Sequence, residues 1–152
     1  SMALAREKGE EFLLNEGILA MIEKGSIFTP GAVKEWMDCG NPKITLETNS
    51  KMLEILNEEG NKLVDDNVIL ENSKIIPPCS IGSGVVIKNA TVGPHSTIGE
   101  GTRIENSIVS RSLVQKHSLI QNAQLEGAMI GNHVHYNGKH KFVNIGDYSE
   151  LS

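Results

Sequence analysis

The sequence from residue 81 reads Ile81-Gly-Ser-Gly-Val-Val, Ile87-Lys-Asn-Ala-Thr, Val92-Gly-Pro-His-Ser-Thr, Ile98-Gly-Glu-Gly-Thr-Arg, and this pattern continues to His135. An aliphatic residue recurs every five or six positions, and a small or β-branched residue usually follows four places later. An α-helix would need an apolar period near 3.6, and a simple strand a period of 2. The pattern therefore predicts a solenoid of short parallel strands, in which each aliphatic side chain points into a central stack.

The aliphatic positions also repeat over a longer distance, at every third rung of the pattern. Grouping the rungs in threes predicts three faces, whose members are Ile81, Ile98, Val114 and Ile130; Ile87, Ile104 and Ile120; and Val92, Val109 and Leu125. The second face places Asn89, Asn106 and Asn122 at one corner. Asn tolerates the left-handed backbone that a tight corner needs, and side chains stacked about 4.8 Å apart can bond along the stack. We expect the aliphatic residues from Ile87 to Leu125 at these positions to be buried.

Composition narrows the functional classes. The 152 residues are 39% hydrophobic but only 4% aromatic, which suits a narrow core of Ile, Val and Leu. A net charge of −5 without a basic block argues against nucleic-acid or anionic-membrane partners. No signal peptide is visible and no apolar run approaches the roughly 18 residues of a membrane span, so we expect a cytoplasmic protein. Cys39 and Cys79 are too far apart for a metal pair, and Cys79 falls in a small inward slot, which predicts a buried free thiol.

The residues before the repeat predict a small α/β segment of helices and short strands. A first helix ends at Gly9, a second begins at Leu14-Asn15 and ends at Gly25, and a third begins at Asn41-Pro42 and ends at Gly60. Short strands are predicted over 26–29 and 33–37, and the apolar face of the third helix is predicted to comprise Leu46, Met52, Leu53 and Leu56. The repeat begins faintly at Leu63, Ile69 and Ile75. A loop or splayed coil is predicted from Tyr136 to Asn144, and one more rung from Ile145 to Ser149. The fold class is therefore mainly β, with domains at 3–60 and 61–152.

Two resemblances refine this description. The repeat resembles the hexapeptide repeat of left-handed parallel β-helices; the hand is implied by the resemblance, since the general rule for parallel crossovers would give a right-handed coil. Residues 10–60 resemble the closing segment of a sugar-1-phosphate nucleotidyltransferase domain. The stretches that carry this second resemblance are Glu11-Phe-Leu-Leu-Asn15, Met21-Ile-Glu-Lys-Gly25, Glu35-Trp-Met-Asp-Cys-Gly-Asn-Pro42 and Leu46-Glu-Thr-Asn49. The order of parts is similar to that of bacterial glucose-1-phosphate thymidylyltransferase-like enzymes.

The resemblance implies a transferase of nucleotide-sugar biosynthesis. Such enzymes join a nucleoside triphosphate to a sugar 1-phosphate and release pyrophosphate, with Mg²⁺ held by carboxylates. Asp38 matches one metal-holding Asp of the family; alternatively, it caps the turn before the third helix. The family's nucleotide-binding half is not in this sequence, and Gly99-Glu-Gly-Thr-Arg103 copies its phosphate-loop letters in the register of a β-helix corner. We therefore predict no catalytic or cofactor-binding residues in this chain alone, and a homo-oligomer in which the β-helix serves assembly or regulation.

Two other hypotheses remain open. His117 and His133 each stand three residues after an aliphatic residue of the first face, so they are predicted to stack one coil apart. Either could act as the base of a hexapeptide acyltransferase that modifies a sugar nucleotide, and the pair could bind a metal. Exposed corner residues are the simpler interpretation, and His95 lies on another face. A free-standing structural or binding module is the third hypothesis.

Overall fold

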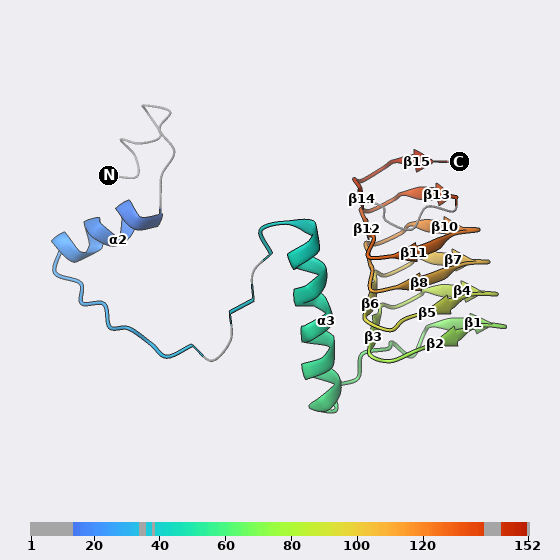
Figure 1. Cartoon of the computed structure of the whole chain (residues 1–152), viewed down its shortest axis with the longest axis horizontal. Helices are drawn as coiled ribbons and strands as arrows, with labels where there is room; N and C mark the ends of the chain where they lie inside the picture. The colour runs from blue at the N-terminus through green and yellow to red at the C-terminus, as the bar shows by residue number, and fades with distance from the viewer. Residues whose placement is uncertain (1–13, 34–35, 38, 139–143, 152) are drawn as a thin grey trace. The chain divides into compact units, whose positions relative to one another are not determined.

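Short parallel strands form three sheets, and the coils of the chain stack on one another as a β-helix (Figure 1). The β1 sheet contains β1 (Ile69–Glu71), β4 (Val86–Lys88), β7 (Arg103–Glu105), β10 (Leu119–Gln121), β13 (His135–Asn137) and β15 (Glu150–Leu151). The β2 sheet contains β2 (Lys74–Ile75), β5 (Thr91–Val92), β8 (Ile108–Ser110) and β11 (Gln124–Glu126). The β3 sheet contains β3 (Cys79–Ile81), β6 (Ser96–Ile98), β9 (Leu113–Val114), β12 (Met129–Ile130) and β14 (Asn144–Ile145). The predicted mainly β, parallel β-helix is confirmed.

This computed structural model describes residues 14–33, 36–37, 39–138 and 144–151. The chain divides into two compact units, Ser1–Trp36 and Met37–Ser152. The predicted domain division at residue 60 stays a prediction. The helix predicted before Gly9 lies outside the described residues.

The register of the three sheets confirms the three predicted faces. Ile81 pairs with Ile98, Ile104 with Ile120, and Val92 with Val109, and the remaining members follow the same order. The eight aliphatic side chains predicted to be buried are at most 1% exposed; they are Ile87, Val92, Ile98, Ile104, Val109, Val114, Ile120 and Leu125. Burial of each such side chain stabilises the fold by about 1.5–3 kcal/mol. The stack of aliphatic residues therefore supplies most of the apolar core.

Small residues fill the inward slots near the corners. Ser107, Ser112 and Ser118 are buried, and each hydroxyl oxygen accepts a hydrogen bond from a backbone N–H of the next coil at 3.0–3.1 Å. A buried hydroxyl without a partner would destabilise the core, whereas these hydroxyls link one coil to the next. The small position of the repeat thus serves both packing and hydrogen bonding.

An asparagine ladder runs along the corner that follows the β1 sheet. The ladder consists of Asn72, Asn89, Asn106, Asn122 and Asn137, and each side-chain amide donates to the oxygen of the next at 2.9–3.4 Å. Asn89, Asn106 and Asn122 have φ values of 47°, 49° and 50°. The predicted left-handed corner and its stacked side chains are confirmed.

In the first coil the predicted register is wrong by one residue at two of three positions, whereas Ile75 pairs with Val92 as predicted. Leu70, and not Ile69, pairs with Ile87, while Val64, and not Leu63, forms a bridge with Ile81. A shift of one residue moves a strand's side chains to the opposite face. Register in this coil is set by pairing with the complete coil above it, because its apolar residues have a neighbouring coil on one side only.

The last coils keep to the repeat further than predicted. Tyr136 pairs in register with Ile120 and is 1% exposed, so this residue continues the core instead of beginning a loop. Gly138 leaves room for the ring, since a Cβ there would lie 3.3 Å from the Tyr136 hydroxyl. Residues 139–143 lie outside the described residues, and the additional rung predicted from Ile145 is confirmed by β14 and β15.

Two helices among the described residues precede the β-helix. Helix α2 (Leu14–Glu23) ends in a hydrogen-bonded turn with Gly25 at φ +89°. Helix α3 (Pro42–Glu58) begins as predicted, because the Asn41 side chain accepts a hydrogen bond from the Ile44 N–H at 3.0 Å. Neither helix combines the length and apolar character that a membrane-spanning helix needs.

The strand predicted over 26–29 is wrong. These residues adopt no regular structure, and residues 33, 36 and 37 adopt none either; Lys34 and Glu35 lie outside the described residues. A strand exists only with a hydrogen-bonded partner, and no described residue pairs with this segment. On α3, Leu53 is buried as predicted, but Met52 is exposed.

Candidate functional site

Helix α3 is attached to the outer surface of the β3 sheet. The Thr97 hydroxyl of β6 donates a hydrogen bond to the Asn49 side-chain oxygen at 2.7 Å, and His95 Nε2 lies 2.9 Å from Glu54 Oε1. Leu53, four residues after Asn49 and therefore on the same side of the helix, is only 3% exposed. These contacts hold α3 along the β-helix, immediately after the segment that carries Asp38.

The predicted histidine pair forms part of an exposed aromatic ladder. The rings of His117 and His133 stack with centroids 5.3 Å apart, and Tyr148 stacks on His133 at 4.8 Å. All three have a positive φ of 55–58°, which places them at equivalent corner positions of successive coils. The stacking prediction is confirmed, and Tyr148 extends it by one ring. Among the described residues, no three His, Cys, Asp or Glu side chains lie close enough together to hold a metal ion.

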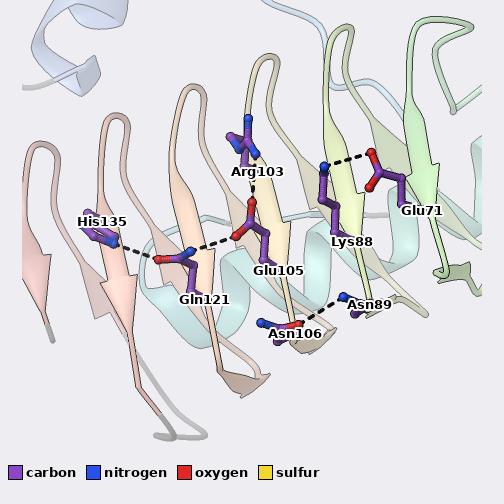
Figure 2. Close-up of polar contacts among 8 residues, drawn as sticks. All are labelled: Glu71, Lys88, Asn89, Arg103, Glu105, Asn106, Gln121 and His135. Carbon is purple, nitrogen blue, oxygen red and sulfur yellow. Dashed lines mark hydrogen bonds and ion pairs between the residues drawn. The ribbon is translucent and has the colours of Figure 1, made fainter.

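A polar network crosses the outer surface of the β1 sheet (Figure 2). Arg103 donates to Glu105 at 2.9 Å, Gln121 donates to the other Glu105 oxygen at 2.8 Å, and His135 Nε2 lies 3.2 Å from Gln121 Oε1. Because a carboxylate only accepts, the Gln121 amide must direct its NH₂ group to Glu105 and its oxygen to His135. His135 Nε2 is therefore the donor of the last bond.

The same network changes the acidity of Glu105. Hydrogen bonds from Arg103 and then Gln121, together with the nearby positive charges, lower the pKa of the Glu105 carboxyl below its ordinary value. On the neighbouring strands Lys88 forms an ion pair with Glu71 at 2.9 Å. No motif in the sequence singled out this surface. The sequence nevertheless indicates it, because polar residues recur directly beside the buried Ile87, Ile104 and Ile120 and must point outward.

The other residues that the sequence singled out either form part of the β-helix or lie outside the described residues. Asp38, the predicted metal ligand, is outside the described residues. Of the stretch Gly99 to Arg103, the first four residues form the corner between β6 and β7 and Arg103 begins β7, and the Thr102 hydroxyl donates to the Gln115 carbonyl at 2.8 Å. The predicted position of these letters at a β-helix corner is therefore confirmed.

Cys79 is the buried free thiol that the small slot predicted. Its side chain is 3% exposed, and its sulfur lies 2.9 Å from the Ile76 carbonyl oxygen. Burial raises the pKa of this thiol above its ordinary value. Because the thiolate is the reactive form, burial makes Cys79 a poor nucleophile, and its side chain fills the small slot of its coil.

Comparison with known proteins finds no family model that matches the chain and no similar curated protein. The structure itself shows a parallel β-helix with helix α3 attached to its side. Three of its surfaces are candidates for function: the contact between α3 and the β3 sheet, the aromatic ladder, and the polar network on the β1 sheet.

Proposed function

We propose that this chain is the C-terminal portion of a sugar-1-phosphate nucleotidyltransferase, in which the β-helix serves assembly or regulation. The observation that carries the proposal is the exposure of large apolar side chains before α3. Ile27, Val33 and Trp36 are 91%, 69% and 84% exposed. Such residues normally pack against a partner surface. The rest of a catalytic domain would provide that surface.

The order of the elements supports the same proposal. A helix ending at Gly25, a segment containing Trp36, a helix capped by Asn41 and a β-helix follow one another as the resemblance implies. The contacts between α3 and β6 would make the β-helix a fixed support for the catalytic segment. The catalytic domain would then keep a constant position on an assembly built from β-helices.

The metal chemistry belongs to the complete enzyme. Mg²⁺ would neutralise the phosphate oxygens during in-line attack, and it usually needs substrate phosphates to complete its coordination. The described residues contain no cluster that would hold it, so we derive no catalytic step through Mg²⁺ from them. Asp38 remains its proposed ligand by resemblance.

Calorimetry and a pyrophosphate-release assay test this function. The present chain, titrated with nucleoside triphosphates and Mg²⁺, is expected to show no saturable binding below millimolar concentration. The complete reading frame that encodes it should release pyrophosphate from a nucleoside triphosphate and a sugar 1-phosphate, and Asp38→Asn should lower turnover strongly. Tight nucleotide binding by the present chain, or an inactive complete reading frame, would contradict the proposal. Acetyl transfer from acetyl-coenzyme A by the present chain would favour the acyltransferase hypothesis.

A further inference from the structure

A groove of about 1210 Å³ runs beside the asparagine ladder. One wall is the ladder from Asn72 to Asn122, and the opposite wall is formed by outward side chains of the β2 sheet. The lining residues on the second wall are Lys74, Thr91, Ile108 and Gln124. The floor contains only small residues, Ala90, Ser107 and Ala123 among them, which leaves the space between the walls open.

The ladder presents the same hydrogen-bonding groups at every coil. A side-chain amide has two N–H donors and an oxygen with two lone pairs. Each of Asn89, Asn106 and Asn122 donates one N–H to the next amide and accepts one bond from the previous amide. One donor and one acceptor position per residue therefore remain for a ligand. Because the coils are about 4.8 Å apart, these pairs repeat at that interval along the groove.

The charge and polarity of the groove define the chemistry of the ligand. Lys74 is the single charged residue among the lining residues, so the groove does not select a polyanion. Ile108 and Leu70 are about half exposed and offer apolar contacts. The centre of a protein interface is usually enriched in aromatic residues and Met, whereas this groove contains amides and hydroxyls. A ligand that combines many hydroxyl groups with apolar C–H faces fits this lining better than a second protein surface.

We propose that the groove binds a neutral, extended oligosaccharide of β-1,4-linked pyranose units. Successive sugars in such a chain advance by nearly the spacing of the coils. The hydroxyls of each sugar can therefore meet the remaining donor and acceptor of one Asn, while a C–H face rests against Ile108. This site is separate from the nucleotidyl-transfer chemistry and does not depend on it.

Calorimetric titration with cellopentaose, maltopentaose and cellobiose tests the site. Cellopentaose should bind saturably. Maltopentaose, whose chain is helical, and cellobiose, which is too short to span several coils of the protein, should each bind at least about tenfold more weakly. The double variant Asn89→Gly/Asn106→Gly removes two amides, and glycine keeps the positive φ without strain. Its affinity for cellopentaose should fall on the order of tenfold.

Two further variants keep the test decisive. Arg111→Gly makes the same kind of change at a left-handed corner between the β2 and β3 sheets, and it should bind cellopentaose as the parent chain does. Thr91→Arg fills the groove without altering the ladder, and it should weaken binding even if the double variant fails to fold.

Equal binding of cellopentaose and maltopentaose would overturn the proposal, as would no binding of either. Dissociation of a self-associated form by the double variant, without any sugar binding, would assign the groove to a second copy of the chain instead.

Discussion

The β-helix and the segment from Leu19 to Trp36 contain similar apolar residues but place them in opposite environments. Ile104 in the β-helix is 0% exposed, whereas Ile27 is 91% exposed. Every inward side chain of a middle coil has an equivalent residue above and below it, supplied by the same repeating sequence. The segment around Ile27 has no such repeat, and no described residue pairs with it.

This difference concerns how each region obtains its stability. Each coil of a solenoid contacts mainly the coils next to it. The stability of the whole is therefore approximately the sum of the contributions of the coils and of the interfaces between them. The earlier segment would gain stability only from a surface that covers its apolar side chains. The β-helix is thus the self-sufficient part, and residues 19–36 are the part that would depend on a partner.

Replacement of a core aliphatic residue should have the largest effect. Ile104→Ala removes a fully buried side chain, and we expect it to lower the free energy of unfolding by about 2–5 kcal/mol. The matched change Ile27→Ala alters an exposed side chain and should change stability by less than about 0.5 kcal/mol. Urea denaturation followed by circular dichroism measures both. Similar losses in the two variants would remove the contrast between the regions.

The attachment of α3 should contribute less than the central core. Leu53→Ala deletes the buried residue of this helix and should cost about 2–3 kcal/mol, because the side chain lies at the edge of the unit. Met52→Ala is the control, since Met52 is exposed on the same helix. Amide hydrogen exchange should show faster opening of α3 in the Leu53 variant. Unchanged exchange would mean that α3 is held by its polar contacts alone.

The middle of the β-helix could be predicted because its positions constrain one another. Ile87, Ile104 and Ile120 fall in register only if each rung has the length that the sequence shows, so the period determines the faces and the burial together. The first coil lacked this redundancy. Ile69 and Leu70 are both apolar, and a sequence period alone cannot choose between adjacent residues without pairing from the next coil.

The candidate surfaces differ in how far the sequence alone could predict them. Stacking of His117 and His133 follows from equal positions in successive coils, so the sequence was sufficient. The network from Arg103 to His135 depends on side-chain conformations as well as on register, and the sequence determines only that these residues point outward. The strand predicted over 26–29 failed because local β propensity cannot supply a partner strand.

A change at the asparagine corner should distinguish backbone strain from side-chain bonding. Asn106 has a φ of 49°, and Asn106→Ala should cost about 1–2 kcal/mol because alanine disfavours this region and loses the ladder bonds. Asn106→Gly loses the same bonds without the strain and should cost less. Thermal denaturation of both variants measures the difference. Equal losses would show that the corner's backbone conformation contributes little.

The smallest expected effect is the pH dependence contributed by Glu105. Its folded-state pKa is lowered, chiefly by the hydrogen bond from Arg103, so its contribution to stability is present above the unfolded-state pKa of about 4.3. The contribution disappears as the pH falls through the folded-state pKa. Because solvent screens this surface pair, we expect at most about 0.5 kcal/mol.

Glu105→Gln should therefore be less stable than the parent chain at neutral pH by up to about 0.5 kcal/mol, and the two should become equally stable once the pH has fallen below the lowered folded-state pKa of Glu105. Urea denaturation across this range measures the difference directly. Glu126→Gln is the control on β11, since Glu126 forms no ion pair with a described residue and its substitution should give no such convergence. A Glu105→Gln deficit that grows as the pH falls would contradict the direction of the pKa shift. A deficit that is constant with pH would mean that the network stabilises the surface of the β1 sheet through bonds that do not need the charge of Glu105.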